Sequence, residues 1–225
     1  LITGACGGLG KAFCRELIKT DDLFLTGRSA ERLNELKVEL RTVNPQAKVI
    51  VFQADLTSEK ERENLFSFAD ENDITFSGYF AVAGADIQKA FIRYTPEKIV
   101  FQTRLNFEAN IAVCREVLAR REKNLKILCV SSMSGSTPMP YFAIYSATKS
   151  ALIGFYTSLR YEVKDAKITV LAPGGIPTRK DVKRDIKIQG WTGRMSAKPA
   201  EFVVKKALKA LDKNKRLVIP GAFNK

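Results

Sequence analysis

A glycine-rich loop near the amino end limits the possible folds of this chain more than any other feature. Residues 3–10 read Thr-Gly-Ala-Cys-Gly-Gly-Leu-Gly, after two apolar residues and before an amphipathic stretch that continues to residue 19. Glycine has no Cβ, so the backbone N–H groups at the start of the following helix can approach a pyrophosphate closely. The loop therefore predicts a strand, a turn and a helix that bind a dinucleotide. We expect its cofactor contacts to come from Gly4, Cys6, Gly8, Leu9 and Gly10.

The rest of the chain alternates between short apolar runs and longer amphipathic stretches. We expect strands at 23–26, 48–54, 78–83, 125–131, 167–171 and 216–219, and helices at 8–19, 30–43, 58–70, 96–120, 144–163 and 200–211. This alternation predicts an α/β fold: a doubly wound parallel sheet of about seven strands, with helices on both faces, in a single domain over 1–225. Ligands of such sheets bind at the carboxyl ends of the strands, so the residues that follow each apolar run are candidates for function.

The composition excludes several classes of site. The chain contains no histidine, which removes Ser-His and Cys-His mechanisms and histidine ligands, and we expect no metal site. Cys6, Cys14, Cys114 and Cys129 lack the spacing of a zinc or redox motif, so we expect buried free thiols. No apolar run reaches the ~20 residues that span a bilayer. We expect a cytoplasmic protein without an integral membrane segment, and what lies beyond either end of the sequence stays open.

The formal net charge of +13 arises from 37 Lys and Arg against 24 Asp and Glu. Such a charge suits a nucleic acid, an anionic membrane surface or a phosphorylated ligand. The basic residues are spread along the helices, and the densest stretch, 179–198, holds seven basic and two acidic residues. Because no concentrated basic arm or recognition motif is present, we expect no nucleic-acid partner. A basic module that binds nucleic acid or an anionic membrane is kept as an alternative.

The residues that end the predicted strands indicate the cofactor. After the strand at 23–26, the acidic residue that would accept hydrogen bonds from a ribose 2′-hydroxyl is missing. Arg28 stands there instead, and its guanidinium suits the 2′-phosphate of NADP; the alternative is an exposed arginine at a helix start. Asp55, which precedes Leu56, either accepts from an adenine amino group or caps the helix that begins near Ser58.

Two further strand ends carry small or polar residues. Ala83 and Gly84 follow the strand at 78–83 and permit either a close approach to a ribose or a tight turn. Ser132 follows the strand at 125–131 and would bring a hydroxyl to the same edge of the sheet. A serine after a strand is common, so this position needs a second observation to support a catalytic role.

The sequence contains two Tyr-x-x-x-Lys patterns, and they have different interpretations. Between Tyr94 and Lys98, Pro96 marks the first turn of a helix and leaves the tyrosine outside it, so we interpret this pair as a coincidence. The stretch from Tyr145 to Lys149 contains no proline or glycine, so a helix puts both side chains on one face. The second pair is the candidate catalytic pair.

A tyrosine and a lysine so placed can reduce a carbonyl group with a hydride donor. A phenol has a pKa of about 10, but a cation ~5 Å away at an effective dielectric of ~20 favours the phenolate by about 3.3 kcal/mol, or ~2.4 pKa units. That shift would bring Tyr145 near ~7.5, where proton transfer is efficient. Lys149 would supply the cation and could hold the nicotinamide ribose, while Ser132 would orient and polarise the substrate oxygen.

With these residues assembled, the chain resembles the short-chain dehydrogenase/reductase family from Ile2 to about Ile219. The loop at 3–10 is similar to the cofactor loop of the family, and Ser132, Tyr145 and Lys149 match its catalytic triad. Asn106 matches a helical asparagine that holds a water in the proton relay of the family. The turn at 173–178 is similar to one that contacts the nicotinamide amide, which implies cofactor contacts from Pro173, Gly174, Ile176 and Thr178.

The resemblance also implies a substrate lid and an oligomer, and the sequence departs from the pattern of the family at two places. The lid would run over about 179–197. Apolar candidates for a mostly apolar substrate pocket are Met133, Met139, Tyr141, Phe142, Trp191 and Met195, and ordinary packing is the alternative for each of them. A homodimer or homotetramer would form through the helices at 96–120 and 144–163. The family often has asparagine near the start of 81–84, where Ala and Val stand here. NADP-using members frequently carry a basic residue in the glycine loop, where Cys6 and Gly7 stand instead.

We therefore predict an NADPH-dependent reductase of ketones or aldehydes, reversible as an alcohol dehydrogenase, with a small, largely apolar substrate. The alternative is a non-catalytic NADP-binding regulatory protein on the same fold. That alternative predicts an eroded proton relay, whereas Asn106, Ser132, Tyr145 and Lys149 are all present.

Overall fold

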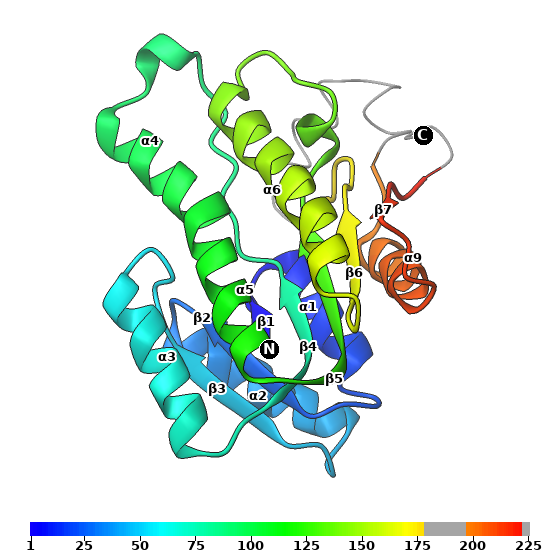
Figure 1. Ribbon diagram of the computed structural model, residues 1–225. Helices are drawn as coiled ribbons and strands as arrows, with labels where there is room; N and C mark the ends of the chain where they lie inside the picture. Colours follow the sequence, from blue (N-terminus) through cyan, green and yellow to red (C-terminus); the bar gives the residue numbers. More distant parts are fainter. Residues whose placement is uncertain (178–196, 222–225) are drawn as a thin grey trace.

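The computed structural model describes residues 1–177 and 197–221, and these contain a parallel sheet of seven strands (Figure 1). The strands follow the order β3-β2-β1-β4-β5-β6-β7 across the sheet, and each neighbouring pair is parallel. Their bounds are β1 Ile2–Thr3, β2 Leu23–Gly27, β3 Val49–Gln53, β4 Phe76–Ala81, β5 Arg121–Val130, β6 Lys167–Leu171 and β7 Leu217–Val218. The strand order reverses between β1 and β4, so a ligand crevice is expected at the carboxyl ends of these two strands.

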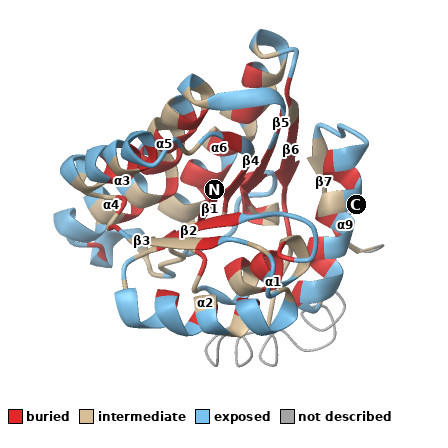
Figure 2. Cartoon of the chain, turned by 90° about the horizontal axis from the view of Figure 1, so that it is seen from below, coloured by how far each residue is buried: buried red, intermediate tan, exposed pale blue. Residues whose placement is uncertain are grey.

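Helices cover both faces of the sheet, which confirms the predicted doubly wound architecture. On one face α1 (Gly8–Leu17), α2 (Ala30–Val43) and α9 (Ala200–Asp212) pack with the strands around Leu25 and Leu128. On the other, α3 (Glu59–Glu71), α5 (Ala109–Ala119) and α6 (Ala143–Glu162) pack around Tyr79 and Ile127. Ile127 and Leu128 are neighbours on β5, and successive strand residues point to opposite faces. Figure 2 shows the buried residues along the strands and on the inner sides of the helices.

The predicted helix starts agree with the capping residues that the structure shows. The Ser29 side chain accepts a hydrogen bond from the backbone N–H of Arg32 at 3.2 Å at the start of α2. Ser58 does the same for Glu61 at 3.3 Å at the start of α3. Pro96 occupies the first turn of α4 (Pro96–Thr103), where its missing N–H costs nothing. Local sequence thus determines where these helices begin.

The prediction of one continuous helix over 96–120 is wrong in its middle. The helix α4 ends at Thr103, a π turn (η2) spans Arg104–Glu108, and α5 follows to Ala119. At the end of the turn the N–H of Ala109 donates to the carbonyl of Arg104, five residues back. Such a turn is wider than an α-helical turn and is often found at functional sites. A pattern with a period of 3.6 residues does not reveal the wider turn.

Two other expectations also need correction. The strand β5 begins at Arg121, four positions before the predicted start, because its exposed polar residues still pair with β4 across a register shift near Phe76. The apolar pattern does not include these residues. All four cysteines are free, but Cys6 is only partly buried, since it lies in the glycine loop at the edge of the sheet.

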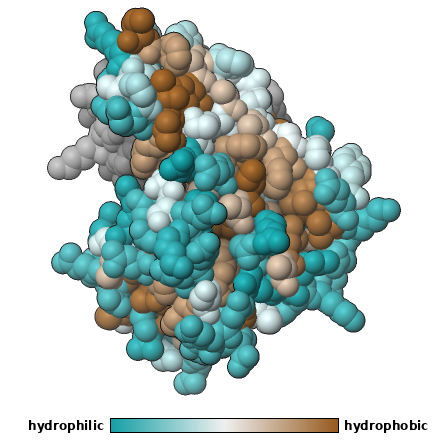
Figure 3. Space-filling model, turned by 60° about the vertical axis from the view of Figure 1, so that its left-hand side comes forward, coloured by the Kyte–Doolittle hydropathy of each residue, from teal (hydrophilic) through white to brown (hydrophobic). Residues whose placement is uncertain are grey.

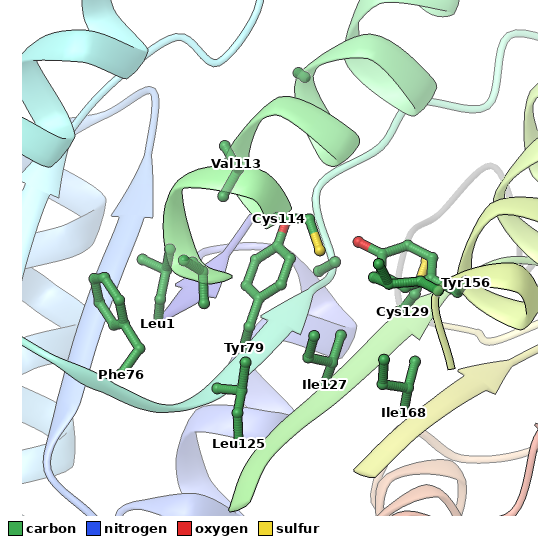
Figure 4. Close-up of a cluster of buried hydrophobic side chains, with 14 of the residues drawn as sticks. Leu1, Phe76, Tyr79, Val113, Cys114, Leu125, Ile127, Cys129, Tyr156 and Ile168 are labelled. Atoms are coloured by element: carbon green, nitrogen blue, oxygen red, sulfur yellow. The ribbon is translucent and has the colours of Figure 1, made fainter. Parts of the chain in front are cut away.

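A buried polar contact joins α5 and α6 inside the larger apolar cluster. Figure 4 shows Tyr79 and Tyr156 extending toward Cys114 from β4 and α6. The Tyr156 hydroxyl donates to Oδ1 of Asn110 at 2.5 Å, and the Tyr79 hydroxyl donates to the Asn110 carbonyl at 3.3 Å. Burial raises the pKa of both tyrosines well above the usual value, so both remain neutral. Neutral, hydrogen-bonded phenols of this kind fix how one helix is rotated against another.

We expect Tyr156→Phe to lower the free energy of unfolding by about 1–3 kcal/mol, because Oδ1 of Asn110 loses its buried donor. Urea unfolding followed by circular dichroism measures the change. Tyr161→Phe is the matched control on the same helix; the Tyr161 side chain is 75% exposed, so this change should stay within about 0.5 kcal/mol. Equal stability of the two variants would show that the contact contributes nothing.

Candidate active site

The glycine loop closes tightly onto the ends of β1 and β4. Gly4 has a φ of +63°, and a Cβ there would lie 2.8 Å from the Cα of Ala83. A Cβ on Gly10 would lie 2.2 Å from the carbonyl oxygen of Gly4, so only glycine fits at this contact. No side chain caps α1, and the first turn therefore keeps N–H groups for a ligand. The loop fits the pyrophosphate of a dinucleotide, which Gly8, Leu9 and Gly10 would bind through their backbone.

Thr3 provides two hydrogen bonds to the segment that follows β4. Its Oγ1 accepts from the backbone N–H groups of Val82 and Ala83, both at 3.2 Å. The end of β4 is thus held to β1 by a threonine, although Ala81 and Val82 stand where the family often has asparagine. Thr3 appears in the sequence motif, but this role was not predicted from it.

Asn106, in the π turn η2, forms hydrogen bonds both to the segment after β4 and to α6. It lies in the π turn and is fully buried; its Oδ1 accepts from the N–H of Ala85 at 2.8 Å. Its Nδ2 donates to the Ala85 carbonyl at 2.9 Å and to Oγ1 of Thr148 at 3.2 Å. Both protons of the side-chain amide are therefore used to position the backbone beside α6.

The first turns of α6 bring Tyr145 and Lys149 to the ends of β4 and β5. The Nζ of Lys149 lies 5.7 Å from the centroid of the Tyr145 ring. Lys149 is buried, and its Nζ donates to the carbonyl of Val130 at 2.8 Å. Burial lowers the pKa of Lys149, because desolvation disfavours the charged form. The structure thus brings together the phenol and the ammonium that the spacing predicted.

Two glycines make room for this lysine. A Cβ on Gly84 would lie 3.3 Å from both Nζ of Lys149 and Oδ1 of Asn106. A Cβ on Gly135, in the short 3₁₀ turn η3 (Met133–Gly135), would lie 2.8 Å from the carbonyl carbon of Lys149. Gly135 was not among the predicted site residues; a glycine three positions after Ser132 was its only sequence signal.

Ser132 lies at the carboxyl end of β5, and its neighbour fixes its position. Its Oγ accepts from the backbone N–H of Ser134 at 3.2 Å and from the Ser134 hydroxyl at 3.0 Å. The preceding Ser131 donates its hydroxyl to the Lys149 carbonyl at 2.7 Å, which joins β5 to α6. Because the Ser132 hydroxyl accepts both bonds, its own proton remains for a substrate oxygen.

The adenosine end of the site has two arginines. Arg28 is exposed at the end of β2, as predicted, and its carbonyl accepts from the side chain of Gln53 at 3.1 Å. Sequence reasoning missed Arg32, whose Nη2 donates to the carbonyl of Cys6 at 2.9 Å. A second basic group therefore lies beside the glycine loop, supplied by α2. Its position one turn after the Ser29 cap was the available signal.

Asp55 does not cap α3, which corrects one of its two predicted roles. Ser58 is the cap, and the Asp55 carboxylate accepts from the N–H and hydroxyl of Thr57 at 2.9 and 2.7 Å. The side chain of Leu56 is buried in the core, and its carbonyl accepts from Arg62 at 2.7 Å. The Asp55 carboxylate lies just after β3, so its other predicted role, as an acceptor for an adenine amino group, stays a prediction.

The nicotinamide end is described only in part. The Pro173 carbonyl after β6 accepts from the N–H of Met133 at 3.0 Å, and Ile176 packs against the core. The ring of Phe142 lies 5.7 Å from that of Tyr145, so this predicted pocket residue lies beside the candidate catalytic tyrosine. Thr178, Trp191, Met195 and nearly all of the lid at 179–197 lie outside the described residues.

The other features of the chain do not compete with this site. Tyr94 lies outside α4 and donates its hydroxyl to the carbonyl of Ile87 at 2.5 Å, which agrees with its interpretation as a coincidental pair with Lys98. A cavity of about 900 Å³ lies at the opposite, amino ends of the strands, beside Leu1 and Phe76. Over the described ranges, no cluster of metal ligands is present, and no helix is long and apolar enough to cross a membrane.

Comparison with known proteins agrees with this geometry. The family model "short chain dehydrogenase" matches residues 1–188. The chain is 32% identical over 211 residues to the 3-oxoacyl-(acyl-carrier-protein) reductase FabG of Rickettsia felis, which covers 92% of this chain and 79% of that protein. It is 29% identical over 188 residues to the hydroxysteroid 11-beta-dehydrogenase 1-like protein of Gallus gallus, which covers 79% of this chain but 64% of that protein.

Solved structures show the same fold. A dehydrogenase/reductase from Sinorhizobium meliloti aligns with a TM-score of 0.86 at 17% identity, over 99% of this chain and 93% of that one. Levodione reductase aligns with a TM-score of 0.83 at 20% identity, over 99% and 96% of the two chains. The glycine loop, the placing of Tyr145 and Lys149 on α6, the matching family model and the shared fold lead to one conclusion. The chain belongs to the short chain dehydrogenase family of oxidoreductases.

Proposed function

We propose that the protein is an NADPH-dependent reductase that converts a ketone or an aldehyde into an alcohol, and that also runs in reverse. The observation that carries this proposal is the buried Lys149 ammonium, 5.7 Å from the Tyr145 ring at the carboxyl ends of β4 and β5. Relatives whose names describe reductases and dehydrogenases support the same reaction class. The cofactor, when bound, supplies the hydride that adds to the carbonyl carbon.

The residues of the chain then supply the proton for the substrate oxygen and stabilise the negative charge that develops on it. The Ser132 hydroxyl donates to the substrate carbonyl oxygen and stabilises the charge that develops there. Tyr145 transfers its phenolic proton to this oxygen as the alkoxide forms. The nearby Lys149 ammonium stabilises the resulting phenolate, and it is also our candidate ligand for the nicotinamide ribose. Since both amide protons of Asn106 are engaged, a role in proton relay would fall to its backbone carbonyl.

The preference for NADPH rests on the charges at the end of β2. The position after this strand carries Arg28 where a carboxylate would repel a 2′-phosphate. Arg32, held on the carbonyl of Cys6, adds a second guanidinium on the same side of the glycine loop. Two arginines compensate for the lack of a basic residue inside the loop itself.

Three finer predictions complete this proposal. The substrate is largely apolar, with Met133 and Phe142 among the residues that contact it. The protein assembles as a homodimer or homotetramer through α4, α5 and α6. It is located in the cytoplasm, where NADPH-dependent reduction would be supplied with cofactor.

We expect Tyr145→Phe to lower kcat by about 10²- to 10⁴-fold, because the proton donor is lost while the ring is kept. NADPH oxidation with a panel of aldehydes and ketones measures the loss, and nicotinamide fluorescence measures cofactor affinity, which should change less than about twofold. Tyr161→Phe on the same helix is the matched control and should be fully active. Full turnover by Tyr145→Phe would disprove the mechanism; NADPH binding without turnover by the parent chain would favour the regulatory alternative.

We expect Arg28→Ala to weaken NADPH binding by about 10- to 150-fold, which corresponds to a charge-assisted hydrogen bond of about 1.5–3 kcal/mol. Binding of NADH, which lacks the 2′-phosphate, should hardly change. Arg41→Ala, in the last turn of α2, removes an equal charge away from the loop and is the matched control. Equal losses for the two cofactors would contradict the phosphate role of Arg28.

A further inference from the structure

Four exposed apolar side chains gather where two loops meet at the carboxyl end of the sheet. Phe91 and Ile92, in the 3₁₀ turn η1 (Phe91–Arg93) after β4, are 62% and 91% exposed. Met139 and Tyr141, in the loop before α6, are 42% and 61% exposed. The N–H of Lys89 donates to the Tyr141 carbonyl at 2.9 Å, so the two loops lie side by side. We call these four residues the apolar rim.

The rim is held in this exposed position by the residues beneath it. Tyr94 is buried, and its hydroxyl bond to the Ile87 carbonyl closes the loop that carries η1. The ring of Phe91 lies 6.3 Å from that of Tyr94. Tyr141 has a φ of +66°, a conformation that bulky residues rarely adopt, and its carbonyl is the acceptor for Lys89. The apolar side chains are therefore presented outward by a fixed backbone.

Three cations lie beside the rim. Lys89 and Arg93 flank the two apolar residues of η1 in sequence, and Lys98 follows in the first turns of α4. The Lys98 ammonium is the largest cause that lowers the pKa of Lys89, and Arg93 contributes less, so both cations lie near Lys89. Within the described part of the chain, none of the three forms an ion pair with an acidic side chain.

One acidic residue close to these cations in sequence, Glu97, is hydrogen-bonded within the start of α4. Glu97 is the one acid between residues 87 and 98. Hydrogen bonds from its own backbone N–H and from the Thr95 side chain lower the pKa of Glu97. Its carboxylate therefore accepts hydrogen bonds in the first turn of α4. The rim thus combines outward apolar side chains with a local excess of positive charge. Figure 3 shows apolar side chains gathered at the upper end of the molecule, where Figure 1 places the connection between β4 and α4.

We propose that the apolar rim docks on an anionic lipid surface, with Phe91 and Ile92 entering the headgroup region and Lys89, Arg93 and Lys98 facing the lipid phosphates. Apolar side chains beside basic ones are the pattern by which proteins bind the membrane interface without spanning it. A second copy of the chain fits less well, because a symmetric contact would bring two sets of cations together. A nucleic acid would leave the apolar side chains without apolar partners.

Docking in this way would bring the start of α6 close to the bilayer. Tyr141 lies four residues before Tyr145, so the rim and the catalytic tyrosine belong to one continuous segment. An apolar substrate dissolved in the membrane would then have a short path to the site. The docking itself does not depend on the proposed reaction, and its test needs no substrate.

The test is co-sedimentation of the full chain with vesicles of phosphatidylcholine alone or with about 30% phosphatidylserine. We expect binding to the anionic vesicles and little binding to the neutral ones. Raising the salt from about 0.1 M to about 1 M shortens the Debye length from about 10 Å to about 3 Å and should release most of the protein. Absence of binding to the anionic vesicles would overturn the proposal.

Two pairs of variants separate the rim from the general charge of the protein. The double change Phe91→Ser with Ile92→Ser should weaken binding about tenfold or more. Val38→Ser with Val43→Ser, on α2, removes two other exposed apolar side chains and should change binding less than about twofold. Replacing Lys89, Arg93 and Lys98 by Gln should cost about fivefold for each charge, far more than replacing Lys205, Lys206 and Lys209 on α9.

Equal losses in a rim variant and its matched control would overturn the proposal, because binding would then follow net charge or total apolar surface. Thermal unfolding of each variant checks that the fold is kept. Analytical ultracentrifugation supplies the remaining outcome. If Phe91→Ser with Ile92→Ser dissociates an oligomer while vesicle binding is unchanged, the rim is covered by a second copy of the chain, and the lipid proposal is wrong.

Discussion

The burial of one lysine ammonium is the constraint on which the rest of the site depends. An ammonium removed from water is costly unless it is hydrogen-bonded, and Lys149 meets this requirement through the carbonyl of Val130. The space around it is left by Gly84 and Gly135, where a Cβ would meet its Nζ or its backbone. The need to make room for Lys149 thus explains why glycine stands at both of these positions, which lie outside the glycine loop. The same burial lowers the pKa of Lys149, but it also reduces the screening by water of a positive charge beside Tyr145.

Hydrogen-bonded side chains, more than apolar packing, hold the segments that meet at this lysine. Thr3 ties the end of β4 to β1, and Asn106 ties the following residues to α6. Within the apolar core, Oδ1 of Asn110 accepts a hydrogen bond from the Tyr156 hydroxyl, which joins α5 to α6. Apolar contacts alone tolerate small rotations of a helix, whereas buried polar groups lose free energy when their partners move. The π turn is explained in the same way, because it carries Asn106 inward to its partners.

The connection between β4 and α4 has two sides with different properties. Its inner part, at Ala85, is fixed by Asn106 beside α6. Its outer part presents Phe91 and Ile92 to solvent, next to a group of cations. One short segment therefore links the wall of the site to an exposed apolar surface. A ligand that binds the outer part would contact the same segment that forms the inner part.

The sequence by itself determined the architecture and the placing of Tyr145 beside Lys149. Local signals sufficed for these features: apolar periodicity for the sheet, Ser29 and Ser58 for the helix starts, and a one-turn spacing for Tyr145 and Lys149. Such signals depend on neighbours in the chain, and these are visible in a sequence.

Only the tertiary structure decided the contacts between distant segments. It determined the π turn at Asn106, the hydrogen bonds of Thr3 to β4, and the approach of Arg32 to the carbonyl of Cys6. It also decided that Ser58, and not Asp55, caps α3. Each of these depends on which backbone group lies opposite a side chain in space. That arrangement follows from how the helices pack on the sheet, and no periodicity in the chain encodes it.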